Sequence, residues 1–107
     1  MSLNSLLAKS VSVANTDVIA YTVPAGKQFA NVSLVLVNTG GSPSSIEVAI
    51  SEADVPVTAD YIEKGTQLAA NGGSLRRTNL IMSAGEKIIV KAGMGTVGIR
   101  IFGLEQA

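Results

Sequence analysis

The sequence has no cysteine, histidine or tryptophan, and it has few aromatic residues. Without cysteine, the chain forms no disulfide and offers no thiolate to a metal ion. Without histidine, it lacks the commonest general base and the commonest metal ligand. We therefore expect no enzymatic activity, no bound metal ion and no cofactor.

Charge is also scarce: charged residues make up 15% of the 107 residues, whereas apolar residues make up 47%. The apolar share favours a folded chain over a disordered one, and the length suits one domain with a modest core. Few charges are available to cover the surface of so small a domain. We therefore expect part of that surface to be apolar or rich in Ser, Thr and Asn, as in proteins that bind neighbours.

Long apolar runs are missing from residues 1–14, where Leu6-Leu7-Ala8 is the longest and no basic segment precedes it. A secretory signal peptide needs both features, and a membrane-spanning helix needs about 20 apolar residues. We expect a soluble protein that is made in the cytoplasm and has no membrane partner.

The net charge is zero but unevenly distributed. Residues 1–63 carry six acidic and two basic side chains, and residues 64–107 carry the reverse. Either copies attract one another head to tail, or strands from the two halves interleave and the polarity disappears in space. Zero net charge with few aromatic residues argues against a nucleic-acid partner.

Most of the chain alternates apolar and polar residues with a period of two, which predicts strands with one buried side. The expected strands cover residues 17–23, 30–38, 46–51, 76–82, 87–91 and 96–104. Within 30–38 we expect Val32, Leu34 and Leu36 to face inward. Within 76–82 we expect the same of Thr78, Leu80 and Met82.

Turns rich in Gly, Pro, Asn and Ser separate these strands at intervals of about 8–12 residues, which is typical of a sandwich or jelly roll. We therefore predict an all-β fold, an antiparallel β-sandwich or jelly roll of about eight strands. It would occupy residues 16–107 as a single domain, after a short N-terminal arm at residues 1–15.

Residues 51–65 fit no strand, because Pro56 would interrupt a hydrogen-bonded ladder. We interpret them as a surface crossover with a short helical turn around 58–63. The segment contains four carboxylates at a spacing that matches no known calcium loop, which favours a solvated acidic loop over a metal site. These residues are Glu52, Asp54, Asp60 and Glu63.

The stretch GMGTVG, residues 93–98, matches the dinucleotide-binding pattern G-x-G-x-x-G. That pattern binds a pyrophosphate only where its glycines open a helix within a βαβ unit. Here the following residues, 98–102, alternate and include β-branched side chains, which predicts a strand. We interpret GMGTVG as a hairpin turn and expect no nucleotide cofactor.

Seven residues are candidates for contact with another protein: Leu3, Leu6, Leu7, Val35, Val37, Arg76 and Arg77. The leucines belong to the N-terminal arm, which either packs on its own domain or reaches onto a neighbouring subunit. The valines face away from the inward residues of their strand. The two arginines point to opposite faces of theirs. They form either a solvated edge that discourages strand stacking or an ion pair across a subunit contact.

Six motifs between about residue 16 and the end of the chain resemble, in their order, those of small tailed-phage virion proteins. They are YTVPAGK (21–27), SLVLVNTG (33–40), IEVAIS (46–51), ADYIEKG (59–65), SLRRTNLIMSAGEKIIVKA (74–92) and VGIRIFGLE (97–105). That group includes capsid decoration (cement) proteins and β-sandwich modules of heads, tails and fibres. The resemblance implies a β-sandwich or jelly roll, no enzymatic activity and a role in virion assembly.

A decoration protein of this kind would bind the outer capsid and bridge neighbouring subunits of the major capsid protein. Many bound copies would turn modest contacts into a large stabilisation of the shell. We thus expect a capsid-surface location in the virion and a homo-oligomer, either a dimer or a trimer. The alternative is a tail-fibre or baseplate module that binds a host-surface glycan or another tail protein. It should carry an exposed aromatic patch, for which Tyr61 is the loop candidate.

Overall fold

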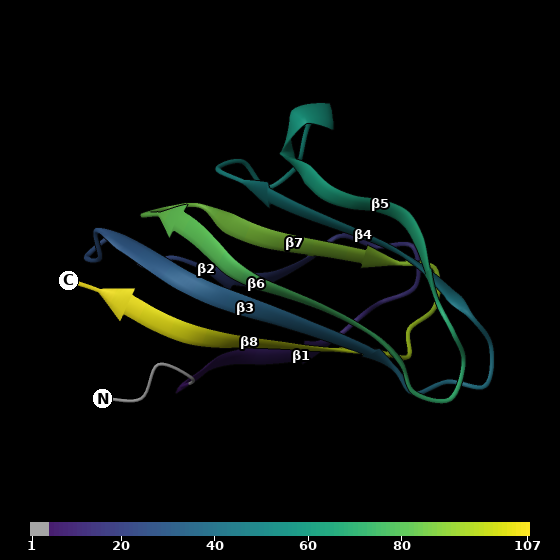
Figure 1. Ribbon diagram of the computed structural model, residues 1–107. Coiled ribbons are helices and arrows are strands. Elements are labelled where there is room, and N and C mark those ends of the chain that lie inside the picture. Colours follow the sequence, from purple (N-terminus) through teal and green to yellow (C-terminus); the bar gives the residue numbers. More distant parts are fainter. Residues whose placement is uncertain (1–4) are drawn as a thin grey trace.

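The computed structural model describes residues 5–107, which form two four-stranded antiparallel sheets packed face to face (Figure 1). The first sheet has the order β1-β8-β3-β6, and the second has the order β2-β7-β4-β5. The strands are β1 (Ser5–Val11), β2 (Val18–Thr22), β3 (Phe29–Asn38), β4 (Ser44–Ser51), β5 (Tyr61–Leu68), β6 (Gly73–Ser83), β7 (Lys87–Ala92) and β8 (Val97–Gln106). The prediction of an all-β sandwich of about eight strands is confirmed.

The core lies between the sheets and is built from alternate residues of each strand. On β3, Val32, Leu34 and Leu36 are fully buried, as expected, and β7 contributes Ile88 and Val90. Burying one such side chain is worth about 1.5–3 kcal/mol. Because the side-chain period of a strand is two, a slip of one residue would expose the whole set, so this alternation fixes the register.

The two halves of the sequence interleave, because each sheet contains strands from both. Three ion pairs within residues 5–107 each join an acid from residues 1–63 to a base from residues 64–107. They are Glu47–Lys64 at 3.6 Å, Asp54–Lys87 at 3.6 Å, and Glu63–Arg77. The uneven charge along the sequence therefore does not separate the molecule into two oppositely charged lobes.

Residues 5–11 belong to the sandwich and do not form a separate arm. They are strand β1, which pairs antiparallel with β8 at the edge of the first sheet. Leu7 packs against the core, and a bulge between Leu6 and Ala8 turns Ala8 to the same side. Pairing with β1 satisfies backbone groups of β8 that would otherwise form an open edge. Of the two positions left open for the arm, packing on its own domain is the one observed, and Leu3 lies outside the described residues.

Strand β6 departs from the expected alternation. Met82 is buried and Leu80 packs against the core, but Thr78 is exposed on the opposite side, so the prediction that it faces inward is wrong. The cause is a β-bulge between Arg77 and Leu80, where Asn79 has a φ of 56°. The extra residue reverses the side-chain alternation. Thr78 therefore shares the outer face of the first sheet with Arg76.

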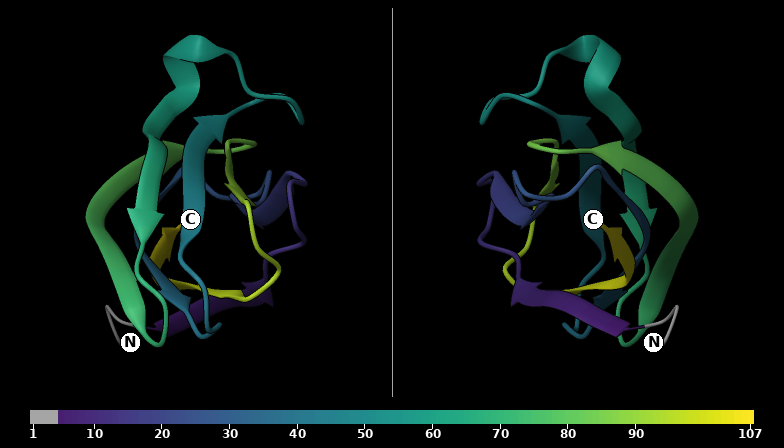
Figure 2. Two further views of the ribbon diagram at one scale, coloured as in Figure 1. Left: turned by 90° about the vertical axis from the view of Figure 1, so that its right-hand side faces the viewer. Right: turned by 90° about the vertical axis from the view of Figure 1, so that its left-hand side faces the viewer.

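The segment before β5 contains the expected helical turn, but it is shorter than predicted. A 3-10 helix, η1 (Thr58–Asp60), ends where β5 begins at Tyr61. Residues 61–65 thus belong to an edge strand and not to a crossover loop. Helix η1 and the loop before it project from the sandwich on the side away from β1 (Figures 1 and 2).

The GMGTVG stretch connects β7 to β8, and no helix begins within or after it in the described chain. Since β7 and β8 lie in different sheets, the turn crosses between sheets, so its interpretation as a hairpin turn is wrong. Two sequence-distant serines hold it in place. The Ser12 hydroxyl donates to the Met94 carbonyl (2.7 Å) and accepts from the Val97 amide (3.1 Å). The Ser44 hydroxyl accepts from the Met94 amide (3.2 Å).

Candidate docking face

The outer face of the first sheet carries a row of three basic side chains. In the strand register, Lys9 of β1 lies opposite Arg100 of β8. Arg100 also lies opposite Val35 of β3, and Val35 lies opposite Arg76 of β6. Residues directly opposite one another point to the same side of a sheet. Since neighbouring strands are about 4.8 Å apart, the backbones of the row span roughly 15 Å. All three cations are exposed. We call this outer face the docking face.

Apolar side chains lie on both sides of the basic row. The next row along the strands includes Leu6 and Phe102, and the row beyond the cations includes Val11 and Val37. Leu6 is 44% exposed, Val11 is 60% exposed, and Ile81, farther along β6, is 63% exposed. The docking face therefore combines arginine with exposed apolar surface, a composition that protein interfaces favour.

No acidic residue lies on the docking face, although all eight acids of the chain are among residues 5–107. Glu105 of β8 points into the core and accepts a hydrogen bond from the Tyr21 hydroxyl, which joins the two sheets. The pKa of Tyr21 is raised, first by burial and then by this hydrogen bond and the charge of Glu105. The cations of the row thus have no ion-pair partner within the described chain.

Charge repulsion within the basic row does not favour the fold. Like charges directly opposite on neighbouring strands repel, and Lys9 and Arg100 are such a pair. Lysine on an edge strand discourages pairing with other chains. This does not explain Arg100 on the inner strand β8 or Arg76 on β6 at the opposite edge. The Arg100 guanidinium carbon lies over the Phe102 ring at 5.3 Å, which holds that cation on the surface. Free cations in a fixed row suit an acidic partner surface.

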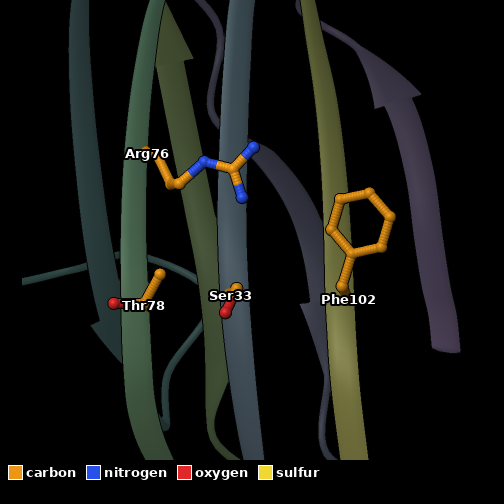
Figure 3. A pocket seen from close by; sticks show the side chains of 4 residues that line it. All are labelled: Ser33, Arg76, Thr78 and Phe102. Atoms are coloured by element: carbon orange, nitrogen blue, oxygen red, sulfur yellow. The ribbon is translucent and has the colours of Figure 1, made fainter. Parts of the chain in front are cut away.

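Two shallow hollows lie on the docking face. One, of about 320 Å³, is lined by Ser33, Arg76, Thr78 and Phe102 (Figure 3). Figure 3 shows the Arg76 guanidinium extending across β3 toward the Phe102 ring, with the two hydroxyl-bearing residues beside it. The other, of about 390 Å³, follows β1 and β8 from Lys9 to Val11 and from Gly98 to Arg100.

The structure brings together four of the seven candidate contact residues, namely Leu6, Val35, Val37 and Arg76, on the docking face. Leu7 packs against the core instead. Arg77 points to the other side of β6 and pairs with Glu63 of β5, which ties the two sheets together at an edge. The ion pair of Arg77 thus lies within the chain and not across a subunit contact.

The residues of the docking face that sequence reasoning missed include Lys9, Arg100 and Phe102. The alternation of residues 96–104 contained the signal for two of them, because 98, 100, 102 and 104 are the positions opposite in phase to the buried ones. Lys9 could be placed only once β1 was known to pair with β8.

Three of the four carboxylates of residues 52–63 are held by protein groups, and Glu52 is the exception. Asp54 pairs with Lys87 at 3.6 Å, and the Asp60 carboxylate accepts the Val57 amide at 2.8 Å. Glu63 pairs with Arg77. Within residues 5–107, no group of three or more acidic side chains is arranged to hold a metal ion.

In the same described part of the chain, no helix has the length and apolar character needed to cross a bilayer. Comparison with protein-family models, with curated proteins and with solved structures found no match to this chain.

Proposed function

We propose that this chain is a structural protein of a tailed phage that attaches to the outer capsid through the docking face. Its partner is the major capsid protein, and its role is to stabilise contacts between neighbouring capsid subunits. The observation that carries the proposal is the row of three unpaired cations among exposed apolar side chains, on a face without acids. The resemblance of the six sequence motifs to virion proteins supports the same class.

The physical form of the face fits attachment to a preformed surface. Its residues lie on regular strands of one sheet and not on loops, so binding orders little backbone and costs little backbone entropy. Arginine's planar fork binds carboxylates with two parallel hydrogen bonds. Repeated over many sites on one shell, a modest contact of this kind stabilises the whole assembly.

Sedimentation with capsids tests this proposal. Capsids of the encoding phage, purified without this protein, are mixed with it at micromolar concentration and pelleted. We expect the protein to pellet and to saturate near the number of capsid sites. The double variant R76Q/R100Q should stay in the supernatant. The control K64Q/K91Q removes two charges from the second sheet and should pellet normally. Wild-type protein in the supernatant, or equal binding of both variants, would refute the proposal.

The alternative function, a tail module that binds a host glycan, is supported less well, because Tyr61 and Phe102 are half-buried and Phe29 is the one exposed aromatic side chain among residues 5–107. Sugars stack on open ring faces, but the Tyr61 ring is covered by the Lys64 ammonium at 4.1 Å. The Phe102 ring is covered by Arg100 at 5.3 Å. Copy number per virion separates the two functions, since a decoration protein is present in numbers comparable with the capsid subunits and a tail module in far fewer.

A further inference from the structure

We propose that the hollow lined by Ser33, Arg76, Thr78 and Phe102 binds a carboxylate, specifically an Asp or Glu side chain on the surface of the docked protein. We call it the carboxylate subsite. The inference rests on the proposed docking function and adds the chemistry of the partner: the capsid surface facing this chain is acidic at the point of contact.

Three strands build the subsite. Arg76 and Thr78 come from β6, Ser33 from β3 and Phe102 from β8. Thr78 reaches the outer face only because of the bulge at Asn79, which reverses the alternation of β6. Bulges commonly re-aim a side chain next to a functional site. Here the bulge places Thr78 on the same face as the Arg76 guanidinium. Figure 3 shows the Thr78 methyl group toward Arg76 and the oxygen on the far side, so a rotation about χ1 would turn the hydroxyl into the hollow.

The donors of the subsite are free. Within residues 5–107, no hydrogen bond or ion pair engages the side chains of Arg76, Thr78 or Ser33. The guanidinium presents N–H donors in a fixed fork, and each hydroxyl adds one donor. An ionised carboxylate accepts hydrogen bonds only, so its two oxygens can take the fork and a hydroxyl together. The Phe102 ring forms an apolar wall that strengthens these bonds by excluding water.

The surroundings favour a carboxylate on a protein over other anions. Lys9 and Arg100 continue the positive row away from the subsite, so an acidic surface of similar width gains from all three cations. A nucleic acid would need a larger excess of positive charge than a chain of zero net charge provides.

A second copy of this chain is a poorer occupant. Its projecting acidic loop is the obvious complement, but Asp54 is already paired with Lys87 and Asp60 already accepts the Val57 amide. Among the described residues of that loop, only Glu52 is left with an unpaired carboxylate, and one acid does not match a row of three cations.

A ¹⁵N-NMR titration of the full chain tests the subsite directly. The probe is a short Glu-Leu peptide, with a Lys-Leu peptide of equal length as the control and glucuronate as a sugar carboxylate. We expect the acidic peptide to shift the amide signals of Ser33, Arg76, Thr78 and Phe102. Added salt should weaken the effect. R76Q should weaken binding roughly tenfold, which is the range of a charge-assisted hydrogen bond.

Two variants separate a binding role from a structural one. R77Q alters the neighbouring arginine, which faces the other side of β6, so it should lower stability through the lost Glu63 pair and leave peptide binding unchanged. T78V keeps the shape of Thr78 but removes its hydroxyl, so it should weaken binding without altering the fold.

Three results would overturn the inference. They are equal effects of R76Q and R77Q on peptide binding, peptide-induced shifts of amide signals outside the subsite, and binding of glucuronate without binding of the peptide. If the amide signals of the subsite change when the protein is diluted in the absence of peptide, a second copy of the chain is the occupant and the inference is wrong.

The failures of the two proposals are distinguishable. If the peptide binds at the subsite but the protein does not pellet with capsids, the capsid function is wrong and the subsite stands. If R76Q pellets with capsids as well as the wild type does, the function stands and the subsite is wrong.

Discussion

Replacing Asn38 tests how the end of the sandwich near the β7–β8 turn is held together. Asn38 ends β3 and is fully buried. Its amide group donates to the carbonyls of Ser42 (2.8 Å) and Leu68 (3.4 Å). Its oxygen accepts from the Gly40 amide (3.1 Å) and from the Thr96 hydroxyl (2.9 Å). One side chain therefore joins the loop after β3, the end of β5 and the turn before β8.

The cost of N38A follows from the partners that it leaves behind. Each neutral hydrogen bond contributes roughly 0.5–1.5 kcal/mol, and a buried group left unpaired costs more. The Ser42 carbonyl lies in an exposed loop where water can replace the amide, and the Leu68 bond is long. We therefore expect a loss of about 2–4 kcal/mol in the free energy of unfolding. At about 4–8 °C per kcal/mol for a domain of this size, the melting temperature should fall by roughly 8–32 °C.

Thermal unfolding followed by circular dichroism, together with urea denaturation, measures this loss. The matched control is N31A, because Asn31 lies on the same strand, is half-buried on the docking face and makes no side-chain hydrogen bond within residues 5–107. We expect N31A to change stability by less than about 0.5 kcal/mol. If N38A lowers the free energy of unfolding no more than N31A does, the buried network does not stabilise this end of the sandwich, and the reasoning is refuted.

Three further predictions concern single side chains. K9E should raise the free energy of unfolding by about 0.2–1 kcal/mol, because an opposite-charge pair with Arg100 replaces a like-charge pair. The same variant should bind the acidic peptide more weakly, and a loss of stability in urea would contradict the prediction. G103A should destabilise the protein by at least about 2 kcal/mol, because Gly103 has a φ of 148° and an added Cβ would collide with the backbone of β3; an unchanged melting temperature would count against it. Because the pKa of Tyr21 is raised in the folded protein, unfolding releases its proton above the ordinary tyrosine pKa, so stability should fall as the pH rises above about 10. Y21F should remove that part of the decline, and parallel pH profiles of the two proteins would show that Tyr21 does not contribute.

The sequence alone determined the properties that depend only on residues adjacent along the chain. The direction of a side chain on a strand follows from its position in the alternation, so Val32, Leu34 and Leu36 could be assigned to the core without a partner strand. The same local reasoning excluded a helix after GMGTVG, because β-branched alternation continues into β8. The fold class followed from these local patterns together with the spacing of the turns.

Tertiary structure decided which strands meet and in what register. A period-two pattern is the same whichever strand lies beside it, so it did not show that β1 pairs with β8 or that the β7–β8 turn crosses between sheets. The bulge that turns Thr78 outward depends on the facing strand β3 as much as on Asn79 itself. The basic row needs the register of four strands at once, because backbone hydrogen bonds between distant segments bring Lys9, Arg76 and Arg100 into one line across the sheet.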